Sequence, residues 1–205
     1  HKLLSPPTMN VRPTLDRVKE SLFNLIGPEI EGTRVADLFA GTGNLCLEAL
    51  SRGAGRAVLV EQDPSHLEYL KRNIRKLRFG AEAAARLGDG TNLERLAAQL
   101  PGPFDLIFLD PPYLFSDRLD FPDYLARLGA SSLLAPGGML AVECQAVRLP
   151  FPGVAGMEPY KERAYGRVGI VLLRKPAGPT PPGAPPGAAP GTDKKIAPGE
   201  PGNLQ

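Results

Sequence analysis

Short apolar runs alternate with helix-like segments along most of the chain, and this alternation limits the possible fold more than any other feature. The runs are continuous and have the length of strands, which is typical of parallel strands buried on both faces. The expected strands cover residues 34–39, 56–61, 83–88, 104–109, 138–143 and 167–173. The expected helices lie within residues 14–27, 44–52, 64–78, 91–99 and 118–129. The pattern predicts an α/β domain with a mostly parallel sheet and helices on both faces, although residues 83–88 (AAARLG) are equally compatible with a helix.

Acidic residues stand at the ends of four successive expected strands. These acids are Asp37, Glu61, Asp89 and Asp110. Each alone has a simpler explanation, because Asp and Glu commonly end strands and begin helices. Together they indicate an acidic rim at the carboxyl ends of the strands, where parallel sheets bind ligands. Such a rim would repel phosphates and suit a cation that carries a ribose and an adenine amine, as S-adenosylmethionine does.

The turn after the first expected strand, DLFAGTGN (37–44), contains Gly41 and Gly43. Glycines at a tight strand-to-helix turn let the backbone approach a ligand closely and adopt positive φ angles. A dinucleotide site would have the longer GxGxxG pattern, whose helix N-terminus binds a pyrophosphate. Here Asn44 and Leu45 follow a GxG without the third glycine, so the turn is less suited to binding a pyrophosphate.

The stretch FDLIFLDPPYLF (104–115) is an apolar strand that ends on an acid, two prolines and an aromatic ring. Two prolines restrict φ and make the turn after Asp110 rigid. Taken alone, the stretch is also compatible with a strand-terminating turn in which Tyr113 only packs.

Five motifs carry a resemblance to a known family. They are RPTLDRVKESLFN (12–24), DLFAGTGNLCLEALSRGA (37–54), VLVEQD (58–63), FDLIFLDPPY (104–113) and AYGRVGIVLL (164–173). Together they resemble the RsmD family, the bacterial 16S ribosomal RNA guanine-N2 methyltransferases, which have a Rossmann-like class I methyltransferase fold and use S-adenosyl-L-methionine. The DPPY motif alone indicates only an amino methyltransferase, and the RPT helix narrows the resemblance to this family.

The resemblance implies roles for individual residues. The turn after the first strand would hold the methionine part of the cofactor, Glu61 the ribose hydroxyls, and Asp89 with Gly90 the adenine edge. The implied cofactor-binding residues are Asp37, Phe39, Ala40, Gly41, Gly43, Glu61, Gln62, Asp89 and Gly90. The implied catalytic residues, which would hold the target base, are Asp110, Pro111, Pro112 and Tyr113.

The target implied by the resemblance is the exocyclic amine of a guanine. This amine is a poor nucleophile because its lone pair is delocalised into the ring, so both of its N–H groups need acceptors. The Asp110 carboxylate and the Pro111 carbonyl can accept them. Tyr113 can stack on a base withdrawn from its neighbours.

The first expected helix has a polar stripe beside its apolar one. Arg17, Glu20 and Asn24 recur at helical spacing, and Arg12 precedes them. The stripe alone indicates an exposed face with local ion pairing. With the resemblance, we expect this helix to cap the cofactor pocket and to offer Arg12 and Arg17, together with Tyr113, to the RNA substrate.

Composition divides the chain into two parts. Residues 1–175 have an ordinary globular composition and form the expected methyltransferase domain, whereas 15 of the 30 residues in 176–205 are proline or glycine. The second part is predicted to be a disordered tail.

A basic stretch, KRNIRKLR (71–78), could meet phosphates or could simply be a solvated helix face.

Several classes of protein are excluded by what the sequence lacks. It has no long apolar span and no signal-peptide core, so a cytoplasmic protein without a membrane partner is expected. Its two cysteines and two histidines have no ligand spacing, so neither a metal site nor a disulfide framework is expected. The expected partner is 16S rRNA or the small ribosomal subunit, and a monomer is expected. The chain departs from the family in its opening HKLLSPPTMN, where members usually have a short basic, glycine-rich hairpin that contacts RNA. Its start at His1 rather than at an initiator methionine suggests a fragment.

Two alternative functions remain. A DNA adenine-N6 methyltransferase would share the DPPY chemistry, but it would normally need a target-recognition domain that about 175 residues do not supply. A non-catalytic RNA-binding or ribosome-assembly protein could retain the fold. The intact Asp110, Glu61 and GxG turn argue against that second alternative.

Overall fold

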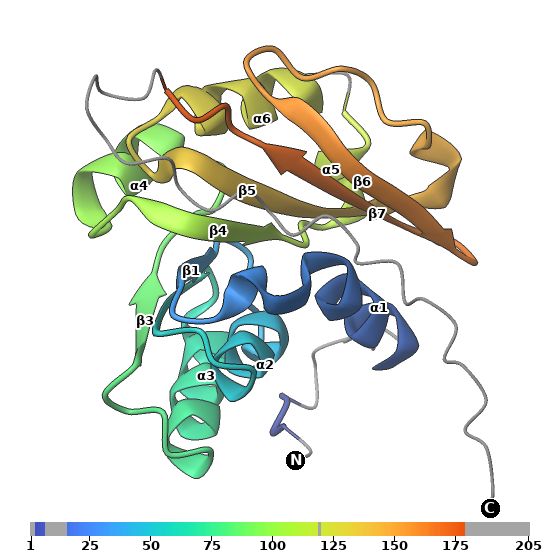
Figure 1. Ribbon diagram of the computed structural model, residues 1–205. Helices are drawn as coiled ribbons and strands as arrows, with labels where there is room; N and C mark the ends of the chain where they lie inside the picture. The colour runs from blue at the N-terminus through green and yellow to red at the C-terminus, as the bar shows by residue number, and fades with distance from the viewer. Residues whose placement is uncertain (1–2, 7–15, 119, 179–205) are drawn as a thin grey trace, which may run out of the picture.

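One seven-stranded sheet forms the centre of the molecule, with the strand order β3-β2-β1-β4-β5-β7-β6 (Figure 1). The computed structural model describes residues 3–6, 16–118 and 120–178. The strands are β1 (Arg34–Asp37), β2 (Arg56–Glu61), β3 (Ala83–Leu87), β4 (Phe104–Leu109), β5 (Leu134–Gln145), β6 (Glu158–Tyr165) and β7 (Val168–Arg174). Strands β1 to β5 pair in parallel, whereas β7 runs antiparallel to both β5 and β6. The predicted mostly parallel sheet is therefore confirmed, and residues 83–87 form a strand.

Helices cover both faces of this sheet, as the continuous apolar strands require. The helices are α1 (Asp16–Ile26), α2 (Asn44–Ser51), α3 (Pro64–Lys76), α4 (Leu93–Gln99), α5 (Tyr113–Ser116) and α6 (Phe121–Ala130), with 3-10 turns η1 (Gly27–Ile30) and η2 (Ala146–Arg148). Figure 1 shows α1, α2 and α3 on one side of the sheet and α4 and α6 on the other. None of the helices within the described ranges combines the length and the apolar composition that a membrane span requires.

Strand β4 shows how the sequence produces two cores. Successive side chains of a strand point to opposite faces, so Leu106 and Phe108 join the core beneath α1, α2 and α3. Ile107 and Leu109 join the core beneath α4 and α6. All four are buried, which explains why this strand reads as a continuous apolar run.

Three elements differ from the sequence predictions. Strand β6 was missed because it is an edge strand whose residues are nearly all exposed, so its sequence EPYKERAY has no apolar pattern. Helix α5 was missed because it has only one turn, which begins directly after Pro112. Strand β5 begins at Leu134 rather than residue 138, because a register irregularity opposite Phe104 accommodates the Pro-Gly-Gly sequence within it.

The pairing also determines which residues meet at one edge of the sheet. Strands β1 to β5 are parallel, so their carboxyl ends lie at the same edge. Because Gln145 at the end of β5 pairs with Val168 at the start of β7, the β6–β7 turn lies at this edge too. We call it the carboxyl edge. Tyr165, just before that turn, is half-buried and packs against the α1, α2 and α3 core.

Candidate active site

Three of the predicted acids meet at the carboxyl edge. Asp37 ends β1, Glu61 ends β2, and Asp110 follows β4. Asp37 is only 2% exposed, and its Oδ1 accepts the Phe39 N–H at 3.0 Å. Burial raises the pKa of Asp37 to about 8; the Phe39 hydrogen bond opposes the rise, and the nearby charges of Asp110 and Glu61 add to it. The cluster therefore favours a bound cation.

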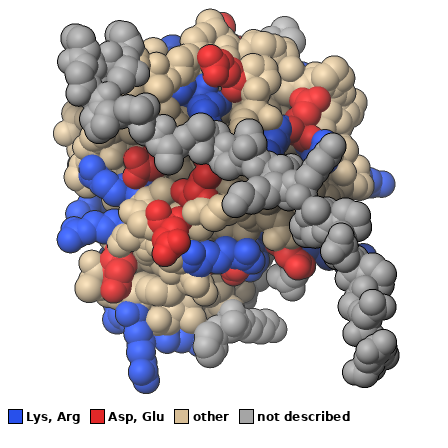
Figure 2. Space-filling view, in the orientation of Figure 1, with Lys and Arg blue, Asp and Glu red and all other residues tan. Residues whose placement is uncertain are grey.

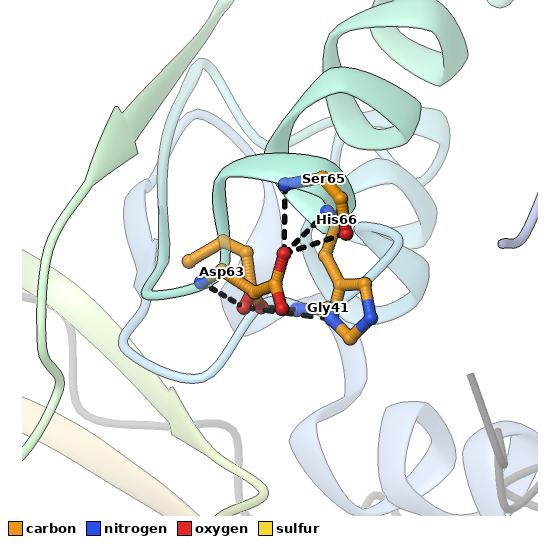
Figure 3. A network of polar contacts seen from close by, with 5 residues as sticks. Gly41, Asp63, Ser65 and His66 are labelled. Carbon is orange, nitrogen blue, oxygen red and sulfur yellow. Dashed lines mark hydrogen bonds and ion pairs between the residues drawn. The ribbon is translucent and has the colours of Figure 1, made fainter. Parts of the chain in front are cut away.

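Glu61 fixes the glycine turn. Its Oε2 accepts the Gly41 N–H at 2.9 Å and its Oε1 accepts the Asp63 N–H at 2.8 Å. Figure 3 labels the two donor residues, Gly41 and Asp63. His66 Nδ1 lies 3.7 Å from the same Oε1. A carboxylate has about four lone-pair positions, so Glu61 retains acceptor capacity for a ligand although it is only 8% exposed.

The glycine turn has its shape because of Gly43. This residue has a φ of +91°, and a Cβ there would lie 2.6 Å from Leu70 Cδ1. Its N–H donates to the carbonyl of Ala40 at 2.7 Å, while the Ala40 N–H donates to Val60 at 2.9 Å. The turn is thus tied to β2, and any larger residue at position 43 would push it away from α3.

Helix α3 begins beside Glu61 with a side-chain cap. Asp63 Oδ1 accepts the Ser65 N–H at 2.7 Å and the His66 N–H at 3.2 Å, drawn in Figure 3. The Ser65 hydroxyl also donates to Asp63. These bonds lower the pKa of Asp63, and the bond from the Ser65 hydroxyl has the largest effect. Gln62 lies exposed between Glu61 and Asp63, at the position predicted for cofactor contact.

The loop after β3 passes close to the turn after β1. A Cβ on Gly90 would lie 2.2 Å from the Leu38 carbonyl and 2.8 Å from the Phe39 ring, so only glycine fits there. Asp89 accepts the Thr91 N–H at 2.9 Å, and its side chain stays at the surface. The structure thus brings Gly90 and Phe39 together, and their contact with a cofactor remains a prediction.

The DPPY segment leaves β4 as predicted and then turns into α5. Asp110 is half-buried, Pro111 is buried and Pro112 is exposed. Pro112 has a φ of −51° and immediately precedes Tyr113, the first residue of α5. The two prolines thus separate a strand from a one-turn helix, which holds Asp110 and Tyr113 at the same edge of the sheet.

An aromatic cluster, which the sequence did not reveal, joins this segment to the rest of the site. The Phe115 ring centroid lies 5.8 Å from that of Phe39, 5.4 Å from Phe121 and 5.0 Å from Tyr124. The Tyr124 hydroxyl donates to the Gly90 carbonyl at 2.7 Å. Burial and the charge of Asp89 raise the pKa of Tyr124, so this hydroxyl remains a donor.

Asn73 is a further residue near the glycine turn that the sequence analysis missed. It is fully buried on α3, and its Nδ2 donates to the Thr42 carbonyl of the glycine turn at 3.0 Å. It also pairs with both backbone groups of Leu4, accepting the N–H at 2.8 Å and donating to the carbonyl at 2.9 Å. One amide therefore holds residues 3–6 beside the glycine turn.

Helix α1 approaches the glycine turn through a different residue from those predicted. Lys19 Nζ donates to Asn44 Oδ1 at 3.0 Å and lies 3.6 Å from Glu48. Arg17 is exposed on the first turn of α1. Arg12 lies outside the described residues. The substrate roles of both arginines remain predictions.

The basic stretch 71–78 lies away from the carboxyl edge. Helix α3 runs from the end of β2 to the start of β3, so its last turn, with Arg75 and Lys76, lies at the opposite edge. Figure 2 shows Lys and Arg gathered over the end of this helix, on a face where both charges are otherwise mixed. Lys71 pairs with Glu68 at 2.7 Å. These contacts favour the solvated helix face over a phosphate-binding surface at the site.

Metal ligands do not cluster in the part of the chain that the structure describes. No group of three or more His, Cys, Asp or Glu residues there could hold an ion. Cys46 and Cys144 are free and buried. Burial raises the pKa of the Cys46 thiol well above its ordinary value, and the charge of Asp37 adds a smaller effect. Cys46 is therefore a core residue.

Comparison with known proteins agrees with this geometry. A family model described as Conserved hypothetical protein 95 matches residues 1–174. Ribosomal RNA small subunit methyltransferase D of Escherichia coli (strain K12) is 33% identical over 177 residues, 86% of this chain and 85% of that protein. The protein of the same name from Haemophilus influenzae is 36% identical over 143 residues, 68% and 72% of the two chains. The solved structure of yhhF from Escherichia coli superposes with a TM-score of 0.72 at 32% identity, covering 86% of this chain and 93% of that one.

The strand order, the antiparallel β7 and the acids at the carboxyl edge define a class I methyltransferase. Within that class, the match over nearly all of the described domain identifies a narrower group. The chain belongs to the RsmD family.

The raised pKa of Asp37 predicts a pH dependence of stability. A carboxyl with a raised pKa keeps its proton in the folded chain at pH values where the unfolded chain has lost it. The free energy of unfolding therefore falls as the pH rises from 3.8, the ordinary pKa of an aspartate, to about 8, the pKa of Asp37 in the folded chain. Asp37→Asn cannot titrate but still accepts the Phe39 N–H. Urea denaturation should show this variant gaining up to about 1.4 kcal/mol per pH unit over the wild type between about pH 5 and 7. Parallel pH curves would contradict the prediction, and the exposed Asp123→Asn is the control.

Asn73→Ala should destabilise the chain by roughly 1–3 kcal/mol, because it leaves the Leu4 and Thr42 backbone groups without their amide partner. Denaturant unfolding measures this change. The matched control is Asn24→Ala on the exposed face of α1, which should alter stability by less than about 0.5 kcal/mol. Equal effects of the two substitutions would show that the buried bonds contribute nothing specific.

Proposed function

We propose that this chain transfers a methyl group from S-adenosylmethionine to the exocyclic N2 amine of a guanine in 16S ribosomal RNA. The observation that carries the proposal is the DPPY segment, whose Asp110 lies near enough to Asp37 for the two charges to interact. An amine-binding segment and a cation-favouring cluster thus share one edge of the sheet. Relatives named ribosomal RNA small subunit methyltransferase D support small-subunit rRNA as the substrate class.

The residues at the carboxyl edge fit the cofactor. When bound, S-adenosylmethionine supplies an electrophilic methyl group on a positively charged sulfur. Asp37 and the glycine turn would hold its methionine part, and Glu61 has lone pairs left to accept ribose hydroxyls. Gly90, which has no room for a Cβ, and Asp89 would receive the adenine edge. Acids rather than phosphate-binding groups line this site, as a cation requires.

The DPPY segment would orient the guanine amine. The Asp110 carboxylate accepts one N–H and the Pro111 carbonyl accepts the other, which fixes the direction of the nitrogen. Pro111 and Pro112 keep these acceptors in place because their φ angles are restricted. The amine becomes acidic as its nitrogen forms the new bond, and Asp110 is placed to accept the proton that leaves. Tyr113 would stack on the base and hold it still.

The direct test is transfer of a tritiated methyl group onto small ribosomal subunits from a strain that lacks this modification. Digestion to nucleosides should place the label in N2-methylguanosine. Label in N6-methyladenosine of DNA would favour the DNA alternative, and binding of RNA without any transfer would favour a non-catalytic protein.

Glu61→Ala should weaken S-adenosylmethionine binding by roughly 1–3 kcal/mol, because ribose hydroxyls lose a charged acceptor and the Gly41 N–H loses its partner. Calorimetry with the cofactor and with its demethylated product measures the change. Glu68→Ala, which removes an exposed acid from α3, is the control and should bind normally. Undiminished affinity in Glu61→Ala would remove this residue from the site.

Asp110→Ala should lower the single-turnover rate at least about a hundredfold, the scale of losing one preorganised electrostatic group. RNA affinity should barely change, because the effect arises mainly as the nitrogen becomes nucleophilic.

Tyr113→Ala should instead weaken base capture by roughly 1–3 kcal/mol, and Tyr113→Phe should retain most activity because the ring does the stacking. Rapid-quench transfer at saturating cofactor measures all three. Near-normal turnover in Asp110→Ala would point to a structural role for DPPY.

A further inference from the structure

Two apolar side chains project into solvent at the carboxyl edge. Leu114 is 92% exposed and Val147 is 82% exposed, more than any other large apolar side chain in the described ranges; Leu87 follows at 55%. Single exposed apolar residues are ordinary on protein surfaces. These two, however, come from neighbouring segments: Leu114 directly follows Tyr113 of the DPPY segment, Val147 lies in η2 directly after β5, and hydrogen bonds connect the two segments.

Hydrogen bonds hold the segments that carry them. The Asp117 N–H donates to the Tyr113 carbonyl at 2.8 Å and closes the single turn of α5. The Asp117 carboxylate accepts the Gln145 amide, and the Asp117 carbonyl accepts the Arg148 guanidinium. Asp117 therefore ties α5 to the end of β5 and to η2.

A further bond extends this framework to the β6–β7 turn. The Ala146 N–H donates to the Arg167 carbonyl at 2.9 Å, so η2 lies beside the turn. Leu114 and Val147 thus stand on anchored backbone rather than on a free loop. We call these two side chains the apolar rim.

We propose that the apolar rim contacts the bases that flank the target base once that base has left its helix in a structured RNA. This inference rests on the proposed function, and it specifies the form of its substrate. An extruded base leaves a gap in the stack, and nucleic-acid-binding proteins fill or open such gaps with apolar side chains such as Leu and Ile. Leu114 adjoins the residue that would stack on the extruded base, so it is placed to meet that base's neighbours.

The charges near the rim favour RNA over a protein partner or a membrane. Arg118 follows α5 and pairs with Asp120 at 2.7 Å, and Arg148 in η2 lies 3.7 Å from Asp117. Arg167 in the β6–β7 turn is exposed. Arginines next to a small apolar feature can contact phosphates while the apolar atoms contact bases. Two side chains alone are too few for the apolar centre of a stable protein interface.

The test compares two hairpins that contain the methylated nucleotide, after nucleoside mapping has identified it. In one hairpin the target base is paired; in the other an abasic site lies opposite, so the base is already free. The double variant Leu114→Ala/Val147→Ala should lose about tenfold or more in kcat/KM on the paired hairpin and less than about threefold on the unpaired one. Cofactor affinity and melting temperature should match the wild type, because both side chains are exposed.

Leu87→Ala is the matched control, since it removes an exposed apolar side chain from the end of β3, a strand that β2 and β1 separate from β4 and the DPPY segment. It should leave both hairpins unaffected, and Leu114→Met should restore most of the loss. Equal activity of wild type and double variant on the paired hairpin would overturn the inference. A loss seen only with assembled subunits would also overturn it and indicate a protein contact. If the wild type methylates no ribosomal RNA at all, the proposed function fails instead.

Discussion

The Glu61 carboxylate is the contact on which the candidate site most depends. It bonds the Gly41 N–H on one side and the Asp63 N–H on the other, so one side chain sets both the turn after β1 and the start of α3. This is possible because β1 and β2 are parallel neighbours whose register pairs Asp37 with Leu59. That register places Glu61 two residues farther along than Asp37, level with the glycine turn.

Site residues that stand at the ends of strands could be predicted from the sequence. Asp37, Glu61 and Asp110 each follow an apolar run, and parallel pairing brings such ends to one edge whatever the details of packing. The glycine turn was predictable for a similar reason, since a strand followed directly by a helix needs a tight turn. The bounds of β2 and β4 agree with the predicted strands because both are buried runs with clear ends.

Residues that act through tertiary contacts could not be predicted in this way. Asn73 lies on the apolar stripe of α3, between Leu70 and Ile74, and a polar residue in such a stripe is the one sequence signal that a buried hydrogen-bond partner exists. Tyr124 lies likewise on the apolar stripe of α6, but nothing local shows that its hydroxyl reaches Gly90. Strand β6 gives no signal, because an exposed edge strand needs no apolar side chains.

The carboxyl edge has two halves that are stabilised differently. In the half formed by β1, β2 and β3, carboxylates accept backbone N–H groups, so acids needed for a cation also hold the loops. In the other half, Asp117 performs the corresponding task for α5 by bonding side chains of Gln145 and Arg148. Phe115 joins the halves, because its ring meets Phe39 on one side and Tyr124 on the other. A shift of α5 would therefore disturb the loops around Gly90 as well as the DPPY segment, which couples the proposed base site to the proposed cofactor site through packing in addition to the charges of Asp110 and Asp37.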